Sequence, residues 1–553
     1  MGSSCQRQLA RALFLAYIQA MLRAFIFVFF IPVCLYAQSQ RQWVDSVYNV
    51  MTLDQKIGQL FMVMAFPDGN LDKQQNTTYK IKKYHLGGIL FSTGTASQQL
   101  RDTYRYQKAS KIPLLIAADA EWGMAMRLKD VTPYPYAMTL GALPNEELIY
   151  DLGKRLGVRK RKMDVHVTFS PVADVNTESQ NPIIGIRAFG DNPKRVAKQA
   201  KAFMEGLQDA GIIAVAKHFP GHGAAKLDSH KGLPKIEYTK NQIDSIGLVP
   251  FINVIEHGVK GIMLGHLEIP SLDNSSLPVS VSYRVITELL QDKMNFNGLV
   301  FSDALDMKGI TTRVESPAVS AFLAGVDVLL MPLRLDKAIN EIKSSYTKGN
   351  ISPDRLETSV KKILAAKYAS GLHQKSTIDR DENPLHDTFY DNYLREQIAM
   401  QSIVKVYVKN KKFPLHPSSD MHYVAFGKKM SDDFFNVIRS KTQVIQVSKQ
   451  QIKATDFSTK TLIVGIHTNT SSPWSSQSFS VDDISILSHL STYPNVHVVL
   501  FANPYALSQI PNLSSFASVL LAHEQQAVFA KAAAQVLFGE ISAIGILPVQ
   551  VKE

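Results

Sequence analysis

Eight short apolar runs recur between about residues 50 and 370, and they constrain the fold more than any other feature. The runs are residues 58–65, 86–91, 113–118, 165–172, 212–216, 261–264, 298–301 and 326–331. They are apolar throughout, as strands buried on both faces are, and amphipathic segments such as 194–208 separate them. Eight strand–helix units in roughly 320 residues predict a (β/α)8 barrel. An open doubly wound α/β sheet is the alternative, but the Gly-rich dinucleotide motif that often accompanies it is absent from the sequence.

Polar and charged side chains stand directly after several of these predicted strands. They are Asp119 and Glu121 after the third run, Asp174 and Asn176 after the fourth, Lys217 and His218 after the fifth, His266 and Glu268 after the sixth, and Asp303 after the seventh. In a barrel, the loops that follow the strands open at one mouth, and catalytic groups gather there. We therefore expect these side chains to converge on a single site.

The densest polar cluster follows the fifth run. Lys217-His218-Phe219-Pro220-Gly221-His222-Gly223 is followed there by Asp228-Ser229-His230. The proline and the glycines let this loop turn sharply and bring its backbone close to a ligand. Zinc is an alternative ligand for four side chains of the loop, namely His218, His222, Asp228 and His230. Their spacing is not typical of a zinc site, so we expect neither a metal nor a cofactor.

The remainder of the chain predicts a linker and a second domain. Residues 373–395 are polar, contain Pro384 and show little apolar periodicity, which is typical of a linker. Residues 396–553 predict a smaller α/β domain with short strands at 403–408, 423–426, 461–465, 496–501 and 517–521, and with a helix near 525–537. This domain carries no cluster of polar residues like that of the barrel, so we assign it no chemistry. The chain stops soon after residue 549, which leaves open a further domain beyond it.

The first 37 residues predict an export signal. Three arginines, at positions 7, 11 and 23, precede the apolar run 24–35, and Ala37 stands before a polar segment. We expect cleavage after Ala37 and hence a periplasmic, cell-envelope or extracellular protein, with no membrane span after cleavage. A retained membrane anchor is the alternative. Cys34 is a poor lipoprotein site because the bulky Val33 precedes it.

Cysteine usage and charge add weaker constraints. Both cysteines, Cys5 and Cys34, lie in the predicted leader, so the mature chain would use neither a disulfide nor a thiolate. The formal net charge is +12, and loss of the three leader arginines leaves +9. A basic exported protein suits polyanionic surroundings such as a cell wall. No Lys/Arg run is interleaved with stacking aromatic residues, so we expect no nucleic-acid partner.

With these segments in view, the chain resembles the glycoside hydrolase family 3 N-terminal domain, in its β-N-acetylhexosaminidase branch. The resemblance covers about residues 50–370, and more loosely the second domain. Its strongest motif is the 217–223 segment with Asp228-Ser229-His230. Supporting motifs are residues 51–60, 169–176, 184–190 and 301–303, and Asp119-Ala120-Glu121-Trp122-Gly123 leading to Arg127.

The resemblance implies a retaining glycosidase with an unusual acid/base. It assigns Asp303 as the nucleophile, which forms a covalent glycosyl-enzyme intermediate, and His230 as the general acid/base with Asp228 as its partner. This is chemically reasonable, because an imidazole titrates near pH 6.5 and can act as acid in one step and as base in the next. Asp306 is a nearby competitor for the nucleophile, but its position favours a helix-turn residue.

The resemblance also implies a sugar-binding set. Lys217 and His218 match substrate-binding residues, and Asp119, Arg127 and Arg187 match further positions of the sugar pocket. A carboxylate can accept two hydroxyl hydrogen bonds, which is a common way to hold the non-reducing end of a sugar. Three neighbours have other expected roles: His222 holds the loop, and Glu121 and Asp174 support the site. His266 stays unassigned.

The expected activity is that of an exo-β-N-acetylglucosaminidase acting on peptidoglycan fragments or amino-sugar oligosaccharides. A β-glucosidase of the same family is the nearest alternative, although such glucosidases generally take their acid/base from outside this loop. A non-catalytic carbohydrate-binding barrel is a second alternative, and transfer of the sugar to phosphate in place of water is a third possibility. The sequence does not indicate an oligomeric state.

Overall fold

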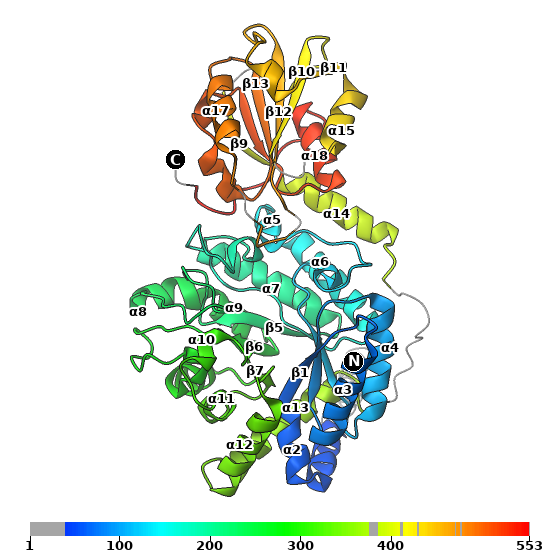
Figure 1. Cartoon of the computed structure of the whole chain (residues 1–553), viewed down its shortest axis with the longest axis vertical. Helices are drawn as coiled ribbons and strands as arrows, with labels where there is room; N and C mark the ends of the chain where they lie inside the picture. The colour runs from blue at the N-terminus through cyan, green and yellow to red at the C-terminus, as the bar shows by residue number, and fades with distance from the viewer. Residues whose placement is uncertain are drawn as a thin grey trace, which may run out of the picture.

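The computed structural model describes residues 39–374, 385–409, 413–427, 431–470, 472–475 and 478–551. The predicted leader, residues 1–37, and residues 375–384 of the predicted linker lie outside the described residues. The described chain forms a lower barrel domain and a smaller upper domain (Figure 1). Within these described residues, no helix combines the length and the apolar character needed to cross a membrane.

Eight parallel strands form a closed barrel. Their bounds are β1 (Phe61–Ala65), β2 (Gly88–Phe91), β3 (Leu115–Ala118), β4 (Val167–Thr168), β5 (Ile213–Phe219), β6 (Gly261–Leu264), β7 (Leu299–Ser302) and β8 (Leu329–Leu330). They are hydrogen-bonded in the order β7-β6-β5-β4-β3-β2-β1-β8. The ring closes between β7 and β8, where the N–H groups of Asp327 and Val328 donate to the Val300 carbonyl at 2.8 and 3.0 Å. Each strand overlaps one of the eight apolar runs, so the predicted (β/α)8 barrel is confirmed.

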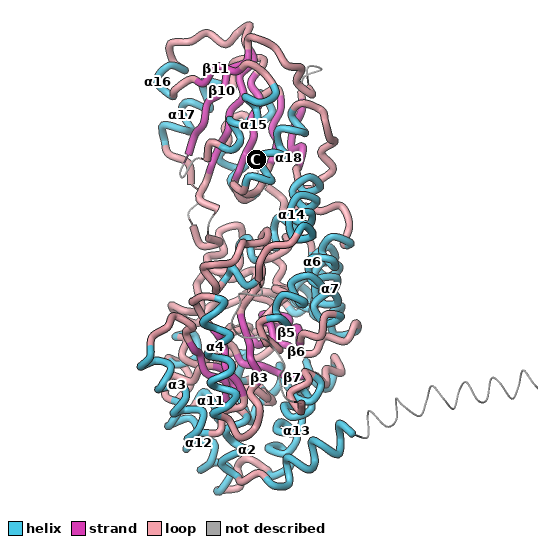
Figure 2. The backbone as a smooth tube through the Cα atoms, turned by 90° about the vertical axis from the view of Figure 1, so that its right-hand side faces the viewer, coloured by secondary structure: helices cyan, strands magenta, loops and turns pink. Residues whose placement is uncertain are grey.

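Helices alternate with these strands and cover the outside of the barrel (Figure 2). They include α2 (Leu53–Gln59), α3 (Leu71–Tyr84), α4 (Ala96–Ala109), α6 (Glu147–Lys162), α7 (Pro193–Asp209), α9 (Leu248–Glu256), α11 (Pro317–Ala324), α12 (Leu335–Thr347) and α13 (Pro353–Ala369). Helix α7 illustrates how the local sequence starts these helices. Asn192 caps it by accepting from the N–H groups of Lys194 and Arg195, and Pro193 occupies the first turn, where no N–H is needed.

Strand β5 places two polar side chains at the barrel mouth. All seven of its residues are buried, and Lys217 and His218 are part of the strand near its carboxyl end. Every residue of β2, β3, β6 and β7 is buried as well, which accounts for the apolar runs of the sequence. The packed strands therefore form a rigid base from which the polar groups at their ends project.

The second domain is a six-stranded α/β sandwich with strand order β11-β10-β12-β13-β14-β9. The strands are β9 (Val404–Val408), β10 (Met421–Gly427), β11 (Val444–Gln446), β12 (Thr461–His467), β13 (Val496–Phe501) and β14 (Ser518–Leu521). Only β9 is antiparallel to its neighbour. Helices α15 (Asp433–Lys441), α17 (Val481–Leu490) and α18 (Ala527–Leu537) pack on the sheet. The five predicted strands are present, whereas β11 was not predicted.

Helix α14 (Phe389–Ser402) joins the domains, lying next to α6 in both views (Figures 1 and 2). It begins inside the segment predicted as a linker, so the last residues of that segment are helical. Asp391 in this helix accepts from Arg155 Nη2 at 2.6 Å and from the Tyr134 hydroxyl. The chain that enters the second domain is therefore tied to the barrel by a buried carboxylate.

Two further contacts hold the second domain at the barrel mouth. Glu524, which follows β14, accepts from the N–H of Tyr136 at 2.9 Å and from Thr139 Oγ1 at 2.7 Å. Asn176, which follows β4, donates to the Tyr505 hydroxyl of the second domain at 2.6 Å. Because Asn176 belongs to a mouth loop, the second domain lies against the end of the barrel where the polar side chains converge.

Candidate active site

A pocket of about 240 Å³ opens at the barrel mouth and contains most of the predicted site. Seven of the eight predicted site residues line it, namely Asp119, Arg127, Arg187, Lys217, His218, His230 and Asp303. The eighth, Asp228, contacts His230 from behind. These residues come from the ends of β3, β5 and β7 and from the loops that follow β3, β4 and β5. The expected convergence of separate strands on one site is thus present, although the roles assigned to these residues stay predictions.

Alternating charges form the floor of this pocket. Lys217 Nζ lies 2.9 Å from Asp119 Oδ1 and 2.8 Å from Glu121 Oε1. Arg127 Nη2 donates to the other oxygen of Asp119 at 2.7 Å, and Arg187 donates to both oxygens of Glu121 at 2.7 and 2.9 Å. The side chain of Lys217 is 4% exposed and that of Glu121 6%. Each buried charge is therefore neutralised by a direct partner.

The pKa values of Asp119, Glu121 and Lys217 follow from these ion pairs. Burial raises the pKa of both carboxyl groups, but the neighbouring cations outweigh it, so the pKa of Asp119 falls well below its ordinary range and that of Glu121 falls to about 2. Burial lowers the pKa of Lys217, yet Asp119 and Glu121 reverse this and raise it above the ordinary value. All three groups are charged at neutral pH.

Asp174 organises the two histidines of the β5 loop from behind. Its Oδ2 lies 2.7 Å from His218 Nδ1, and its Oδ1 accepts from the backbone N–H of His222 at 2.6 Å. His222 is buried, and burial, reinforced by the nearby His218, lowers its pKa to about 4. His222 Nε2 lies 3.2 Å from Ser229 Oγ. As expected, Asp174 is a supporting residue and His222 connects the two halves of the loop.

Asp303 stands immediately after β7 and lines the pocket. Its N–H donates to the Leu264 carbonyl at 3.2 Å, and its Oδ1 accepts from the Ala304 N–H at 2.8 Å. Burial raises its pKa, but the side chain of His218, together with the Ala304 N–H and the side chain of Lys217, outweighs burial and holds the pKa below the ordinary value. The carboxylate is therefore ionised and fixed by backbone contacts, as a nucleophile requires.

His266, which the sequence left unassigned, is buried behind Asp303. Its Nδ1 lies 2.7 Å from Ser280 Oγ, and its Nε2 lies 3.1 Å from the Ala304 carbonyl. A carbonyl only accepts, so Nε2 carries the hydrogen and Nδ1 accepts from the serine. Burial lowers the pKa of this imidazole, so it is neutral. His266 thus steadies the backbone next to Asp303.

His230 and Asp228 form a hydrogen-bonded pair on the loop that follows β5. Asp228 Oδ1 lies 2.8 Å from His230 Nδ1 and also accepts from the backbone N–H of His230 at 2.9 Å. Burial raises the pKa of Asp228, but these two contacts outweigh it and the pKa is lowered. The ionised carboxylate fixes the hydrogen on Nδ1, which leaves Nε2 to exchange a proton. The side chain of His230 is 60% exposed, so it lies at the rim.

The loop that carries His230 is docked on the loop that carries Asp303. Ser229 is buried, and its carbonyl accepts from the Gly309 N–H at 3.1 Å. Gly309 belongs to the short helix α10 (Lys308–Thr311), six residues after Asp303. A side chain at this glycine would place its Cβ 3.0 Å from the Ser229 carbonyl oxygen. Sequence reasoning did not identify Gly309, because its role depends on a contact between two loops.

Sequence reasoning also missed an aromatic residue from the second domain. Trp474, in the loop after β12, lines the same pocket. Five methionines line it as well, at positions 64, 126, 263, 307 and 331. Some of the methionines could have been noticed from the sequence, because three of them, Met64, Met263 and Met331, lie in predicted strands. Trp474 had no such signal, since the second domain carries no polar cluster.

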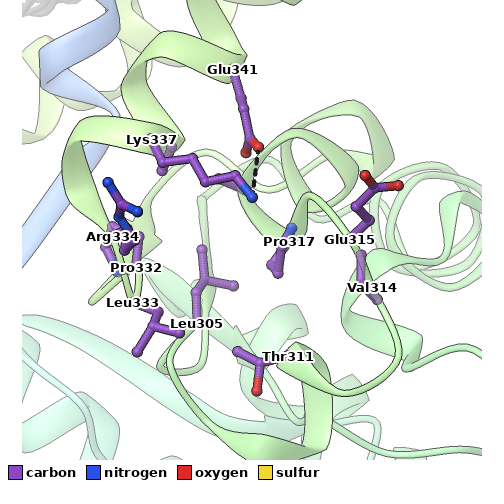
Figure 3. Close-up of a pocket in the computed structure, with 12 residues that line it drawn as sticks. Leu305, Thr311, Val314, Glu315, Pro317, Pro332, Leu333, Arg334, Lys337 and Glu341 are labelled. Atoms are coloured by element: carbon purple, nitrogen blue, oxygen red, sulfur yellow. Dashed lines mark ion pairs between the residues drawn. The ribbon is translucent and has the colours of Figure 1, made fainter.

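A second pocket is lined by the segments that follow β7 and β8 (Figure 3). Its lining includes Leu305, Thr311, Leu333 and Arg334, and an ion pair joins Lys337 to Glu341 at 3.5 Å. None of the predicted site residues lines it. The chemistry-bearing side chains therefore belong to the first pocket.

The zinc alternative requires His218, His222, Asp228 and His230 to be placed around one ion. Throughout the described residues, no group of three or more His, Cys, Asp or Glu side chains is placed to hold a metal ion.

Known proteins are similar to this chain in sequence and in fold. The model of the glycosyl hydrolase family 3 N-terminal domain matches residues 52–366. Beta-hexosaminidase A of Pseudoalteromonas piscicida is 30% identical over 361 residues, which cover 59% of this chain and 60% of that protein. A Cellulomonas fimi protein named beta-N-acetylglucosaminidase/beta-glucosidase is 30% identical over 349 residues, or 61% of each. The matched region therefore spans about 60% of the length of these two relatives.

A solved structure extends the likeness to both domains. The glycoside hydrolase family 3 beta-N-acetylglucosaminidase from Paenibacillus sp. str. FPU-7 matches with a TM-score of 0.77 at 26% identity. The match covers 91% of this chain and 99% of that one. At this coverage it includes most of the second domain together with the barrel.

Proposed function

Because the chain belongs to glycosyl hydrolase family 3, we propose that it is a retaining exo-β-N-acetylglucosaminidase. The observation that carries the proposal is the pairing of Asp228 with His230 at 2.8 Å, in the same pocket as the ionised Asp303. This arrangement supplies one group that can attack a sugar carbon and another that can exchange a proton. The names of the relatives support an amino sugar as the substrate.

The reaction would take two steps. In the first, an Asp303 oxygen attacks the anomeric carbon while protonated His230 gives its Nε2 proton to the glycosidic oxygen, the carbon–oxygen bond breaks, and the alcohol leaves. In the second, neutral His230 accepts a proton from water, the water oxygen attacks the same carbon, and the bond to Asp303 breaks. Two inversions retain the configuration. Acid–base help of this kind contributes about 10²–10⁴ in rate.

The charged floor would hold the terminal sugar. Asp119 and Lys217 face the pocket and can accept from and donate to its hydroxyl groups, with Arg127 at their side. Their mutual ion pairs fix them before the sugar arrives, so binding does not require the side chains to reorganise. The methionine side chains in the wall are apolar and adaptable, which suits the methyl group of an N-acetyl substituent.

Peptidoglycan fragments are the substrate source we favour, and export is the location. Both proposals are supported by the apolar leader with its three arginines and by the net charge of +9 that remains without those arginines, which suits the polyanionic cell envelope. A β-glucosidase is the second candidate, favoured by the dual name of the Cellulomonas fimi relative.

A substrate panel tests the proposal. We expect the protein to hydrolyse 4-nitrophenyl β-N-acetylglucosaminide with a kcat/KM at least ten times (about 1.4 kcal/mol) that for the β-glucoside, and NMR to detect the β-anomer first. A chelator should leave the rate unchanged, and Asp303→Ala should abolish it. A preference for the glucoside, or first release of the α-anomer, would contradict the proposal. Product analysis in phosphate buffer distinguishes hydrolysis from transfer to phosphate.

A further inference from the structure

Trp474 is an aromatic side chain from the second domain in a pocket otherwise built by the barrel. Among the described residues that line this pocket, all the others lie between positions 64 and 331. The Trp474 ring lies edge-on to Trp122, with ring centroids 6.4 Å apart. Trp122 is itself buried and packs edge-on against Tyr136 at 4.9 Å. One side of Trp474 thus rests on a fixed aromatic wall, while 51% of the residue stays exposed.

Exposure separates the floor of the pocket from its rim. Lys217 and Glu121, whose side chains are 4% and 6% exposed, lie at the floor where the terminal sugar would bind. His230 and Trp474 are both more than half exposed and lie at the rim. Since His230 would protonate the oxygen that joins the terminal sugar to the leaving group, the leaving group extends from the floor toward that rim.

We propose that Trp474 is a specificity-determining residue that stacks on the sugar ring on the leaving-group side of the cleaved bond. The C–H groups on one face of a sugar ring form an apolar surface, and an indole ring offers a large flat partner with little conformational entropy to lose. The inference rests on the function proposed above. It also gives the second domain a role in catalysis, namely to complete the leaving-group subsite.

The contacts between the domains keep Trp474 in place. Tyr505 of the second domain binds Asn176 of the mouth loop at 2.6 Å. Glu524 is buried between the domains and binds Thr139 Oγ1 at 2.7 Å. A subsite shared by two domains works only if their relative position is fixed, and these buried polar contacts supply that fixation.

Kinetics on two substrates test the inference. The first is the disaccharide of two β-linked N-acetylglucosamine units, which presents a sugar to the rim, and the second is N-acetylglucosaminyl β-fluoride, which presents none. For Trp474→Ala we expect kcat/KM on the disaccharide to fall roughly 10-fold, the size of a lost aromatic stack. The value on the fluoride should stay within about twofold. Trp474→Phe should retain most of the activity on the disaccharide.

Tyr393→Ala is the matched control, because Tyr393 is 45% exposed on α14 and does not line the pocket. It should leave both substrates unaffected. Equal losses of Trp474→Ala on both substrates, or no loss on either, would overturn the inference while the proposed function stands. Hydrolysis of the fluoride but not of the disaccharide by the native protein would overturn it too. If the native protein cleaves neither, the proposed function fails, and the inference with it.

Discussion

Gly309→Ala tests whether docking between two loops positions His230, the proposed proton donor. The added Cβ would lie 3.0 Å from the Ser229 carbonyl oxygen, 3.1 Å from that of Gly232 and 3.3 Å from His266 Cβ. The first two neighbours are backbone atoms on the loop that carries His230. Ordinary contact begins at 3.4 Å, so this loop must retreat by about 0.4 Å, and the Gly309–Ser229 hydrogen bond must lengthen with it.

The expected loss follows from this displacement. A misplacement of 1 Å can cost about 100-fold in rate, so a shift of a few tenths of an ångström should cost roughly 10-fold in kcat/KM. The loss should depend on the leaving group, because only a poor leaving group needs the proton of His230 to depart. We expect the roughly 10-fold loss on an alkyl β-N-acetylglucosaminide and little change on the 2,4-dinitrophenyl glycoside.

Steady-state kinetics on these two glycosides provide the measurement, and kcat/KM is the quantity to compare because it reports the first bond-breaking step. Lys308→Ala is the matched control, since Lys308 is an exposed neighbour on the same short helix. Circular dichroism should show that both variants are folded. The reasoning would be refuted if Gly309→Ala slowed both substrates equally, or if Lys308→Ala produced the same selective loss.

Two further predictions concern stability. Lys217→Met leaves the carboxylates of Asp119 and Glu121 without their shared cation, so the free energy of unfolding, measured in urea at pH 7, should fall by about 3–5 kcal/mol. Lys361→Met is the control: it breaks ion pairs at the surface and should lower the free energy of unfolding by less than about 1 kcal/mol. Equal losses for the two variants would contradict the argument. Burial raises the pKa of Glu524 from 4.5 to about 7, so the folded state binds this proton more tightly than the unfolded state does. The free energy of unfolding should therefore fall by about 3 kcal/mol as the pH rises from 4.5 to 7. Glu524→Gln should lack this part of the pH dependence, and the same dependence of unfolding free energy on pH in both proteins would refute the prediction.

The sequence predicted the barrel well because its signal is local. A strand buried on both faces has to be apolar at every position, and eight such runs of the right spacing leave few alternatives. The candidate site was predictable for the same reason, since polar residues such as Lys217 and Asp303 stand directly at the ends of those runs. Strand β11 (Val444–Gln446) escaped prediction because it is a short edge strand with mostly exposed residues.

What the sequence did not reveal depends on contacts between distant segments. Trp474 lies in a loop rich in serine and threonine, and nothing near it in sequence indicates that it reaches the barrel pocket. Gly309 likewise has a role only because Ser229 lies against it. The start of α14 did have a local signal, because Thr388 and Asp391 form a capping box. The polar composition of the segment obscured that signal.

The alternating charges at the floor of the pocket limit how this pocket can change during evolution. Arg127, Asp119, Lys217, Glu121 and Arg187 form one chain in which each ion contacts an ion of opposite sign. Replacing an ion in the middle of this chain leaves a buried charge without its partner. A single substitution there therefore lowers fitness before a second, compensating substitution can arise. Trp474, at the rim, is not a member of this chain of ions. Natural or directed evolution toward new leaving groups should therefore accumulate its changes at the rim and leave the floor intact.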